Sequence, residues 1–260
     1  VWRLTGNWRR GAIAGLIVLV FGALPAAPIV WRNATTFGTF QLTSQSGTHL
    51  LHWVVGYSRA FETGVPFGRV SIILNQELDQ RITKARHQQE TMTPFHVSSI
   101  TMSLAKEELA KTAMSTLVKA WMSGIIINLS APTLVIEPRV RKLNKHSFMS
   151  SSGSGLIQRT ISFLKNNDRQ FIFWITIGLV GSAISLAFQI LGWVILLRQM
   201  LWPAIFSAFA VAYFLILNGP IGGPKYRLPI EPILIIFQSV AVIRLFSWLR
   251  IKYHEKFGGV

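Results

Sequence analysis

Apolar residues gather in four long runs that carry almost no charge. These runs are Gly11–Trp31, Phe171–Leu197, Met200–Leu217 and Ile230–Trp248. A helix needs roughly 20 apolar residues to cross a hydrocarbon core of about 30 Å, and the runs are close to that length or longer. Because a helix satisfies its own backbone hydrogen bonds in lipid, we predict an all-α multi-pass membrane protein with four transmembrane helices.

A fifth stretch, Leu117–Ile136, is apolar enough to be another span. However, Lys119, Asn128 and Pro132 lie inside it, and the proline would interrupt a helix. Four spans are therefore favoured. Five spans are the alternative, and a fifth would reverse the side of everything that follows it.

The residues before this stretch have a different pattern. Ser103 is a candidate N-cap, with Glu107 and Glu108 in the first turn that follows it. Apolar residues then recur at helical spacing across Leu109–Trp121, with lysines at the other positions. This pattern predicts one amphipathic helix that lies along the membrane surface.

Composition agrees with a membrane protein. Half of the 260 residues are hydrophobic and only 14% are charged, whereas a soluble globular chain has about 25% charged residues. The 26 basic and 10 acidic residues give a net charge of +16. A nucleic-acid-binding protein can be this basic, but its basic residues would not be separated by long uncharged apolar runs. We therefore exclude a soluble enzyme and a nucleic-acid partner.

The chain contains no cysteine. This excludes disulfides, iron–sulfur clusters, thiolate zinc sites and cysteine nucleophiles. The scattered histidines His49, His52 and His87 are better explained as surface residues than as zinc ligands. We expect no metal and no other cofactor.

Basic residues flank the apolar runs in a pattern that favours one topology. They are Arg3, Arg9, Arg10, Arg198, Arg250, Lys252 and Lys256. Short basic flanks stay in the cytoplasm, so residues 33–170 and the loop at residues 218–229 are expected on the outer side. The organisation is then a first transmembrane helix at residues 1–32, a mainly helical outer segment at 33–170, and a three-helix region at 171–260.

Two short features of the outer segment precede the second span. Ser150–Gly155 is composed of serine and glycine and predicts a flexible linker. Leu156–Leu164 predicts a short helix that leads into the span.

The loop between the last two runs carries the strongest candidate for a binding site. Gly219–Pro232 reads Gly-Pro-Ile-Gly-Gly-Pro-Lys-Tyr-Arg-Leu-Pro-Ile-Glu-Pro. Lys225 supplies a point charge, Arg227 a bidentate fork and Tyr226 a hydroxyl donor, which together suit a phosphate at headgroup depth. The alternative is an ordinary interfacial anchor that binds no ligand.

A second candidate follows the first run. Arg32 and Asn33 end an apolar helix that contains Pro28, and Phe37-Gly38 follows a few residues later. Arg32 can reach an anionic headgroup from the outer face, or it can simply end the helix.

Taken together, these two stretches resemble bacterial glycosyltransferases of the protein O-mannosyltransferase and aminoarabinose transferase superfamily, which have the GT-C fold. The late motif, Lys/Arg-Tyr-Arg-Leu-Pro-x-x-Pro before a final hydrophobic helix, is matched by Lys225, Tyr226, Arg227, Leu228, Pro229 and Pro232. The resemblance covers the first span and about the last ninety residues.

The resemblance implies transfer of a sugar from a polyprenyl-phosphate donor on the periplasmic face of the bacterial inner membrane. It implies that Lys225, Tyr226 and Arg227 neighbour the donor phosphate, and Arg32 is a further candidate ligand of that phosphate. The partner expected from this resemblance is therefore a membrane lipid, with membrane proteins as possible further partners.

The family's catalytic acid lies in the first periplasmic loop of a longer chain, and no stretch here matches that loop. The chain also opens with Val1 rather than Met, so it is expected to be the C-terminal part of such an enzyme or a shortened relative. The catalytic residue is unknown. Four carboxylates are candidates by location only, and are better explained as solvated surface groups: Glu62, Glu77, Asp79 and Glu90.

Two functional hypotheses remain. In the first, the chain is the lipid-donor-binding region of a membrane glycosyltransferase. In the second, it is a non-catalytic membrane subunit of a larger complex, derived from the same family; small-residue faces such as Gly11-x-x-x-Gly15 favour helix packing. A transporter ranks behind both, because the spans lack the paired charges of an ion-coupled pathway.

Overall fold

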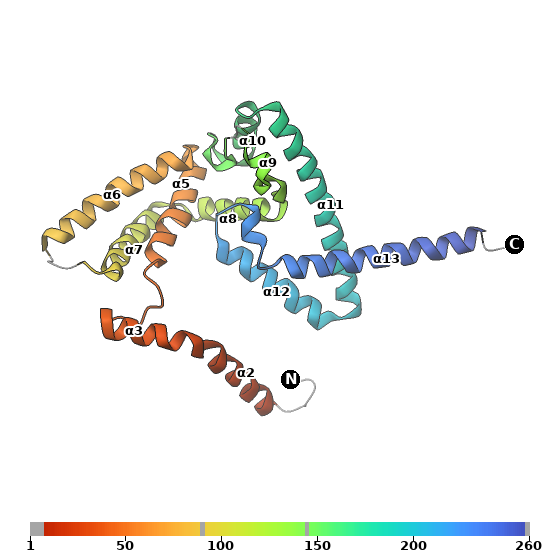
Figure 1. Ribbon diagram of the computed structural model, residues 1–260, viewed down its shortest axis with the longest axis horizontal. Helices are drawn as coiled ribbons and strands as arrows, with labels where there is room; N and C mark the ends of the chain where they lie inside the picture. The colour runs from red at the N-terminus through yellow and green to blue at the C-terminus, as the bar shows by residue number, and fades with distance from the viewer. Residues whose placement is uncertain (1–7, 89–91, 144–145, 258–260) are drawn as a thin grey trace. The chain divides into compact units, whose positions relative to one another are not determined.

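The structure is a computed structural model that describes residues 8–88, 92–143 and 146–257. Within these ranges every regular element is a helix and no strand occurs (Figure 1). Arg3, Glu90 and the side chain of Lys256 lie outside the described residues.

The helices follow one another with short connections. In chain order they are α2 (Trp8–Ala23), η1 (Leu24–Ala26), α3 (Ala27–Phe37), α4 (Ser46–Thr48), the π-helix η2 (His49–Val55), α5 (Gly56–Thr63), α6 (Phe67–Gln88), α7 (Pro94–Lys111), α8 (Met114–Ser130), η3 (Thr133–Ile136), α9 (Pro138–Arg141), η4 (Phe148–Ser150), α10 (Gly155–Lys165), α11 (Arg169–Gln199), α12 (Leu201–Asn218), η5 (Pro224–Arg227) and α13 (Glu231–Phe257).

Four helical segments are long and apolar enough to cross a membrane. They are Trp8–Phe37, Arg169–Gln199, Leu201–Asn218 and Glu231–Tyr253. The first comprises α2, η1 and α3, and the others are α11, α12 and most of α13. The prediction of an all-α multi-pass membrane protein with four spans is confirmed. The alternative fifth span is not formed, because α8 ends at Ser130, just before Pro132.

The single amphipathic helix predicted from Ser103 onward is wrong. Helix α7 already begins at Pro94, where the Thr93 hydroxyl caps it by accepting a hydrogen bond from the backbone N–H of His96 at 3.2 Å. Ser103 therefore lies inside a helix. The helix stops at Lys111, and α8 starts after Ala113, whose backbone is extended.

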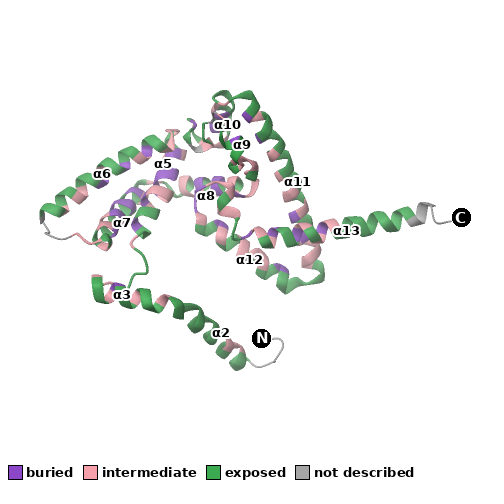
Figure 2. Cartoon of the chain, in the orientation of Figure 1, coloured by how far each residue is buried: buried purple, intermediate pink, exposed green. Residues whose placement is uncertain are grey.

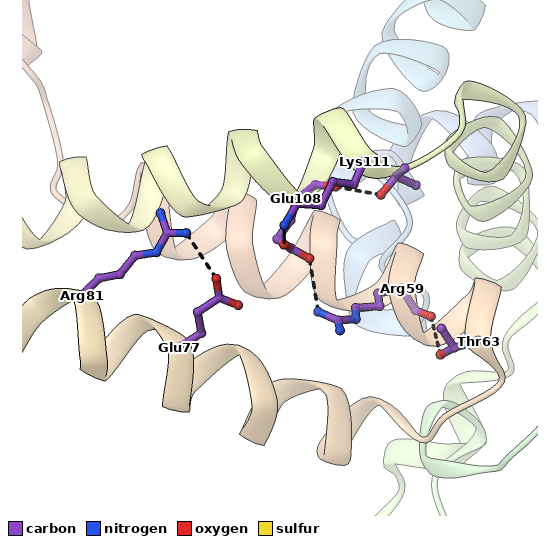
Figure 3. A network of polar contacts seen from close by, with 7 residues as sticks. Arg59, Thr63, Glu77, Arg81, Glu108 and Lys111 are labelled. Atoms are coloured by element: carbon purple, nitrogen blue, oxygen red, sulfur yellow. Dashed lines mark hydrogen bonds and ion pairs between the residues drawn. The ribbon is translucent and has the colours of Figure 1, made fainter.

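Glu108 consequently lies in the last turn of α7 rather than in a first turn. The helix dipole disfavours an anion at this end. Its mostly buried carboxylate accepts hydrogen bonds from Arg59 Nη1 at 3.2 Å and from Lys111 Nζ at 2.6 Å (Figure 3). These two cations offset the unfavourable position and join α5 to the end of α7.

The chain divides into two compact units. Unit 1 comprises Val1–Leu50 and Glu77–Lys106, and unit 2 comprises Leu51–Gln76 and Glu107–Val260. Helices α6 and α7 contribute residues to both units, so the division does not follow the span boundaries.

Unit 1 contains the first span and the helical segments packed near its end. Helix α2 has no buried residue and is mostly exposed (Figure 2). Beyond it, Phe37 and Phe95 pack with ring centroids 5.2 Å apart. Gly47 lies directly against the backbone of Ser98, where a larger residue would not fit.

Unit 2 contains the three remaining spans. Helices α11 and α13 approach so closely that a Cβ on Gly192 would overlap the carbonyl of Phe237. Near this crossing, Gln189 donates to Ser185 at 3.2 Å, and Ser185 donates to Gln238 on α13 at 2.9 Å. Ser185 thus links Gln189 on the same helix to Gln238 on α13. An apolar cluster completes the packing of α12 and α13: Leu215, Ile230, Leu234 and Phe237.

The flexible linker predicted at Ser150–Gly155 is wrong, whereas the short helix predicted after it is confirmed as α10. Ser151 is buried, and the backbone N–H of Gly153 donates to Gly64 O at 2.9 Å. A Cβ on Gly64, whose φ is +72°, would lie 2.9 Å from Ser154 N. The small residues therefore permit close packing of two backbones rather than flexibility.

Candidate functional site

The loop between α12 and α13 is fixed on helix α8. Asn128 of α8 is fully buried, and its side-chain amide donates to Ile221 O at 3.0 Å. Its carbonyl accepts a hydrogen bond from the backbone N–H of Gly223 at 2.9 Å. Gly124, one turn earlier, lets the loop come close, because a Cβ there would lie 2.5 Å from Gly219 O. The loop therefore has a defined conformation.

Arg227 closes the loop from its other end. Its Nε donates to the Glu231 carboxylate at 2.6 Å, and its Nη1 donates to Leu129 O at 3.0 Å. The side chain is only 11% exposed. Arg227 thus joins η5 to α8 and to the first turn of α13, where the carboxylate also suits the helix dipole.

Lys225 is the exposed cation of the loop. Its Nζ lies 4.9 Å from the centroid of the Tyr226 ring, in cation–π geometry. Tyr226 is partly buried, and its carbonyl accepts a hydrogen bond from the Asn218 amide at 3.0 Å. This hydrogen bond fixes the backbone at Tyr226, and the ring lies beside the lysine.

Two residues far away in sequence join this region. Tyr57 of α5 is buried and stacks on Phe67 with ring centroids 4.2 Å apart. Burial and, to a smaller extent, nearby Tyr226 together raise the pKa of Tyr57 to about 12, while Arg159 opposes the shift. Arg159 of α10 is 2% exposed and donates from Nη2 to Ala60 O at 2.7 Å.

Burial lowers the pKa of Arg159, and the interaction with Tyr57 counteracts this shift. Tyr57, Arg159 and Tyr226 thus form a polar cluster inside unit 2. Sequence reasoning missed this cluster, because its members come from three separate helices and no periodicity or motif relates them. The available signal was an arginine in the middle of α10, on the side of the helix opposite Ile157 and Ile161.

Arg32 lies in unit 1, inside α3, which continues to Phe37, so the alternative that Arg32 ends the helix is wrong. Its Nε and Nη2 both donate to the Oδ1 of Asn33, at 3.1 and 2.8 Å. Asn33 is buried and donates from its amide to Gln41 O at 2.7 Å and to Leu42 O at 3.4 Å. The asparagine therefore orients the exposed guanidinium and also ties down the segment that follows α3.

A pocket of about 220 Å³ opens beside this guanidinium. It is lined by Arg32, Asn33, Phe37, Leu42, Thr43, Ser44, Pro94 and Phe95. A pocket for a drug-sized ligand is larger, roughly 300–1,000 Å³. The cation, two hydroxyl side chains and small volume suit a phosphate or sugar group rather than a whole glycolipid.

Three of the four candidate carboxylates, Glu62, Glu77 and Asp79, lie within the described residues. Glu62, in unit 2, accepts a hydrogen bond from Thr116 Oγ1 at 3.4 Å. Glu77 pairs with Arg81 in unit 1 at 3.2 Å (Figure 3), and Asp79 is exposed. In the described ranges, no group of three or more His, Asp or Glu residues is placed to hold a metal ion.

The predicted ligands of the phosphate therefore belong to two separately described sites. Lys225, Tyr226 and Arg227 share η5 in unit 2, whereas Arg32 belongs to unit 1. No protein-family profile, curated protein or solved structure matches this chain. What the fold itself defines is the class of multi-pass helical membrane proteins.

Proposed function

We propose that this chain is the region of a membrane glycosyltransferase that binds a polyprenyl-phosphate sugar donor. The observation that carries the proposal is the loop at residues 218–229. It joins two spans, is fixed on α8 by Asn128, and leaves Lys225 exposed beside the Tyr226 ring. The resemblance to GT-C glycosyltransferases supplies the identity of the ligand.

The physical requirements of such a donor agree with this loop. A polyprenyl phosphate has an anionic head at the membrane surface and a long apolar tail in the lipid. A loop between two spans lies at headgroup depth, where an exposed lysine attracts phosphate as a point charge. The adjoining spans expose apolar side chains such as Ile216, Leu217 and Ile235, which offer a surface to the tail.

The pocket at Arg32 supports the same class of ligand from unit 1. It also lies at the end of a span, and Asn33 holds its guanidinium in place. The remaining N–H groups of Arg32 and the hydroxyls of Thr43 and Ser44 can bind phosphate or sugar oxygens. We assign it as a second headgroup site.

The proposal places both sites on the periplasmic side of the bacterial inner membrane, since the short basic flanks of the spans favour a cytoplasmic position. The cysteine-free chain allows a direct test with Leu228→Cys, because Leu228 is exposed in the loop. A membrane-impermeant maleimide added to intact spheroplasts is expected to label this cysteine. Labelling only after the membrane is opened would place the loop in the cytoplasm and contradict the proposal.

Binding is tested with the Lys225→Ala variant of the full chain in nanodiscs. We expect affinity for undecaprenyl phosphate, measured by native mass spectrometry, to fall about tenfold, the loss of one charge-assisted contact. The matched control is Lys252→Ala. Lys252 also lies over an aromatic ring, 4.6 Å from the Trp248 centroid, but near the far end of α13.

The control variant is expected to change affinity by less than about twofold, as for an exposed surface charge. Equal losses in the two variants would mean that the lipid phosphate responds to overall charge and not to the loop. Unchanged binding in Lys225→Ala would reject the assigned role outright.

A non-catalytic membrane subunit is the second candidate, and the exposure of α2 favours it. No residue of that helix is buried, and a Cβ on Gly15 would meet nothing within 4 Å. Such a face accepts a neighbouring helix closely. Purification from native membranes in mild detergent discriminates: a defined stoichiometric complex supports the subunit, and a monodisperse single chain supports the first proposal.

A further inference from the structure

Helix α10 has its apolar side turned outward. Ile157, Ile161 and Leu164 are 78%, 49% and 48% exposed, whereas Arg159 and Phe163 are buried. At 100° per residue the three exposed apolar residues lie within about 60° of one another, and the two buried residues lie on the opposite side. A helix in water would have the reverse arrangement.

The position of α10 relative to the second span is fixed by packing within unit 2. Phe163 contacts Phe171, in the first turn of α11, with ring centroids 5.9 Å apart, and contacts Phe148 at 5.7 Å. The Asn167 amide, in the short connection, donates to Phe163 O at 2.8 Å. Helix α10 therefore lies beside the N-terminal end of α11 (Figure 1).

The length of α11 places this end at the membrane surface. Its 31 residues extend about 46 Å, whereas the hydrocarbon core is about 30 Å thick. The excess puts the first turns of α11, and with them α10, at headgroup depth. Exposed apolar residues continue down α11 at Phe173, Trp174 and Ile177, and an aromatic pair at this level is typical of a membrane interface.

Charge agrees with the same environment. Lys165, in the last turn of α10, and Arg169, at the start of α11, are both exposed. Cations at this level attract anionic lipid headgroups. The apolar stripe formed by Ile157, Ile161 and Leu164 thus faces the acyl chains. The basic residues flank this stripe at the level of the lipid phosphates.

We infer that α10 is an interfacial membrane anchor, whose Ile157, Ile161 and Leu164 insert into the boundary between headgroups and acyl chains of an anionic bilayer. The anchor fixes the level at which Arg159, on the inner side of the same helix, meets Tyr57. This inference does not depend on the proposed function, because it uses only α10, α11 and the bilayer.

The cysteine-free chain permits a direct test by single-cysteine scanning of six exposed positions, 157, 158, 160, 161, 164 and 165. Each full-length variant is labelled with an environment-sensitive fluorophore and reconstituted into vesicles containing phosphatidylglycerol. Quenching is then measured with brominated acyl chains and, separately, with aqueous iodide.

We expect brominated lipid to quench most strongly at 157, 161 and 164, and iodide to quench most strongly at 158 and 165, with a helical period of about 3.6 residues. Positions 158 and 165 are matched controls on the same helix. Iodide quenching without lipid quenching along the stripe would overturn the anchor. Shielding of the stripe from both quenchers would also overturn it, and would point to a second copy or another protein as the covering partner.

Discussion

The loop at residues 218–229 and the pocket at Arg32 are both held by a buried asparagine, but they expose different cations. In each, a buried asparagine side chain bonds to the backbone of a segment that lies beside a cation. Asn128 bonds to Ile221 and Gly223 in unit 2, and Asn33 bonds to Gln41 and Leu42 in unit 1.

The difference lies in which cation each asparagine leaves exposed. Asn33 binds the side chain of Arg32 itself, so the oriented guanidinium lines the pocket. Asn128 binds only backbone groups, and Arg227 is occupied by Glu231 and Leu129. The exposed cation there is Lys225. A motif rich in cations therefore does not reveal which cation is available to a ligand.

The largest effect is expected where the backbone partners of the asparagine are most enclosed. Asn128→Ala removes partners from the partly buried Gly223 N–H and the buried Ile221 carbonyl, which costs about 2–4 kcal/mol. Asn33→Ala is expected to cost about 1 kcal/mol, because the exposed Gln41 and Leu42 segment can hydrogen-bond to water instead. Thermal unfolding of both variants in nanodiscs measures the difference.

The control for this pair is Asn166→Ala, which removes an exposed asparagine bonded to Ser162 at 3.3 Å and should leave stability nearly unchanged. An Asn33→Ala variant as unstable as Asn128→Ala would show that the two regions are equally enclosed, and the comparison would fail.

A smaller effect distinguishes the two arginines. Arg227→Lys is expected to lower the free energy of unfolding by about 1–3 kcal/mol, because one ammonium group cannot bond to both Glu231 and the Leu129 carbonyl. Arg32→Lys, at an exposed position, should cost less than about 0.5 kcal/mol. Chemical denaturation reports both values. The reverse order would assign the structural role to Arg32.

The smallest effect is a dependence on pH that comes from Tyr57 in unit 2. The folded state holds the pKa of Tyr57 near 12, so the neutral phenol is favoured, and an unfolded tyrosine loses its proton near pH 10. Stability from this group is present below pH 10 and is lost as pH rises toward 12, by about 1 kcal/mol at pH 11.

Tyr57→Phe should remove this part of the pH dependence, as seen by comparing unfolding of the variant and the original chain at pH 8 and pH 11. Tyr213→Phe, at an exposed tyrosine, is the control. Identical pH dependence in Tyr57→Phe and the original chain would mean that Tyr57 titrates normally.

The spans were predictable from the sequence because each depends on local composition. An uncharged run such as Gly11–Trp31 predicts a span without information from the rest of the chain. The helices extend such runs only by a few residues into their polar flanks. Pro132 likewise marked the end of α8. These features need no knowledge of distant residues.

The site was only partly predictable, because its decisive contacts join residues far apart in the chain. Asn128 reaches the loop across 93 residues, and Arg227 reaches Leu129 across 98. In the sequence, Asn128 argued only against a membrane span. The serine and glycine of Ser150–Gly155 show the same limit, since composition does not distinguish close packing from flexibility.

The crossing of α11 and α13 at Gly192 has a consequence for biogenesis. Because their backbones meet at Gly192 and Phe237, the two helices can associate only after the ribosome has delivered α13 to the bilayer. Until then α11 and α12 form a hairpin in the membrane without α13. The hydrogen bonds that link Gln189 through Ser185 to Gln238 are then incomplete. Insertion of α13 is thus the step that completes the C-terminal bundle. Truncated chains that lack α13 should be degraded by quality-control proteases.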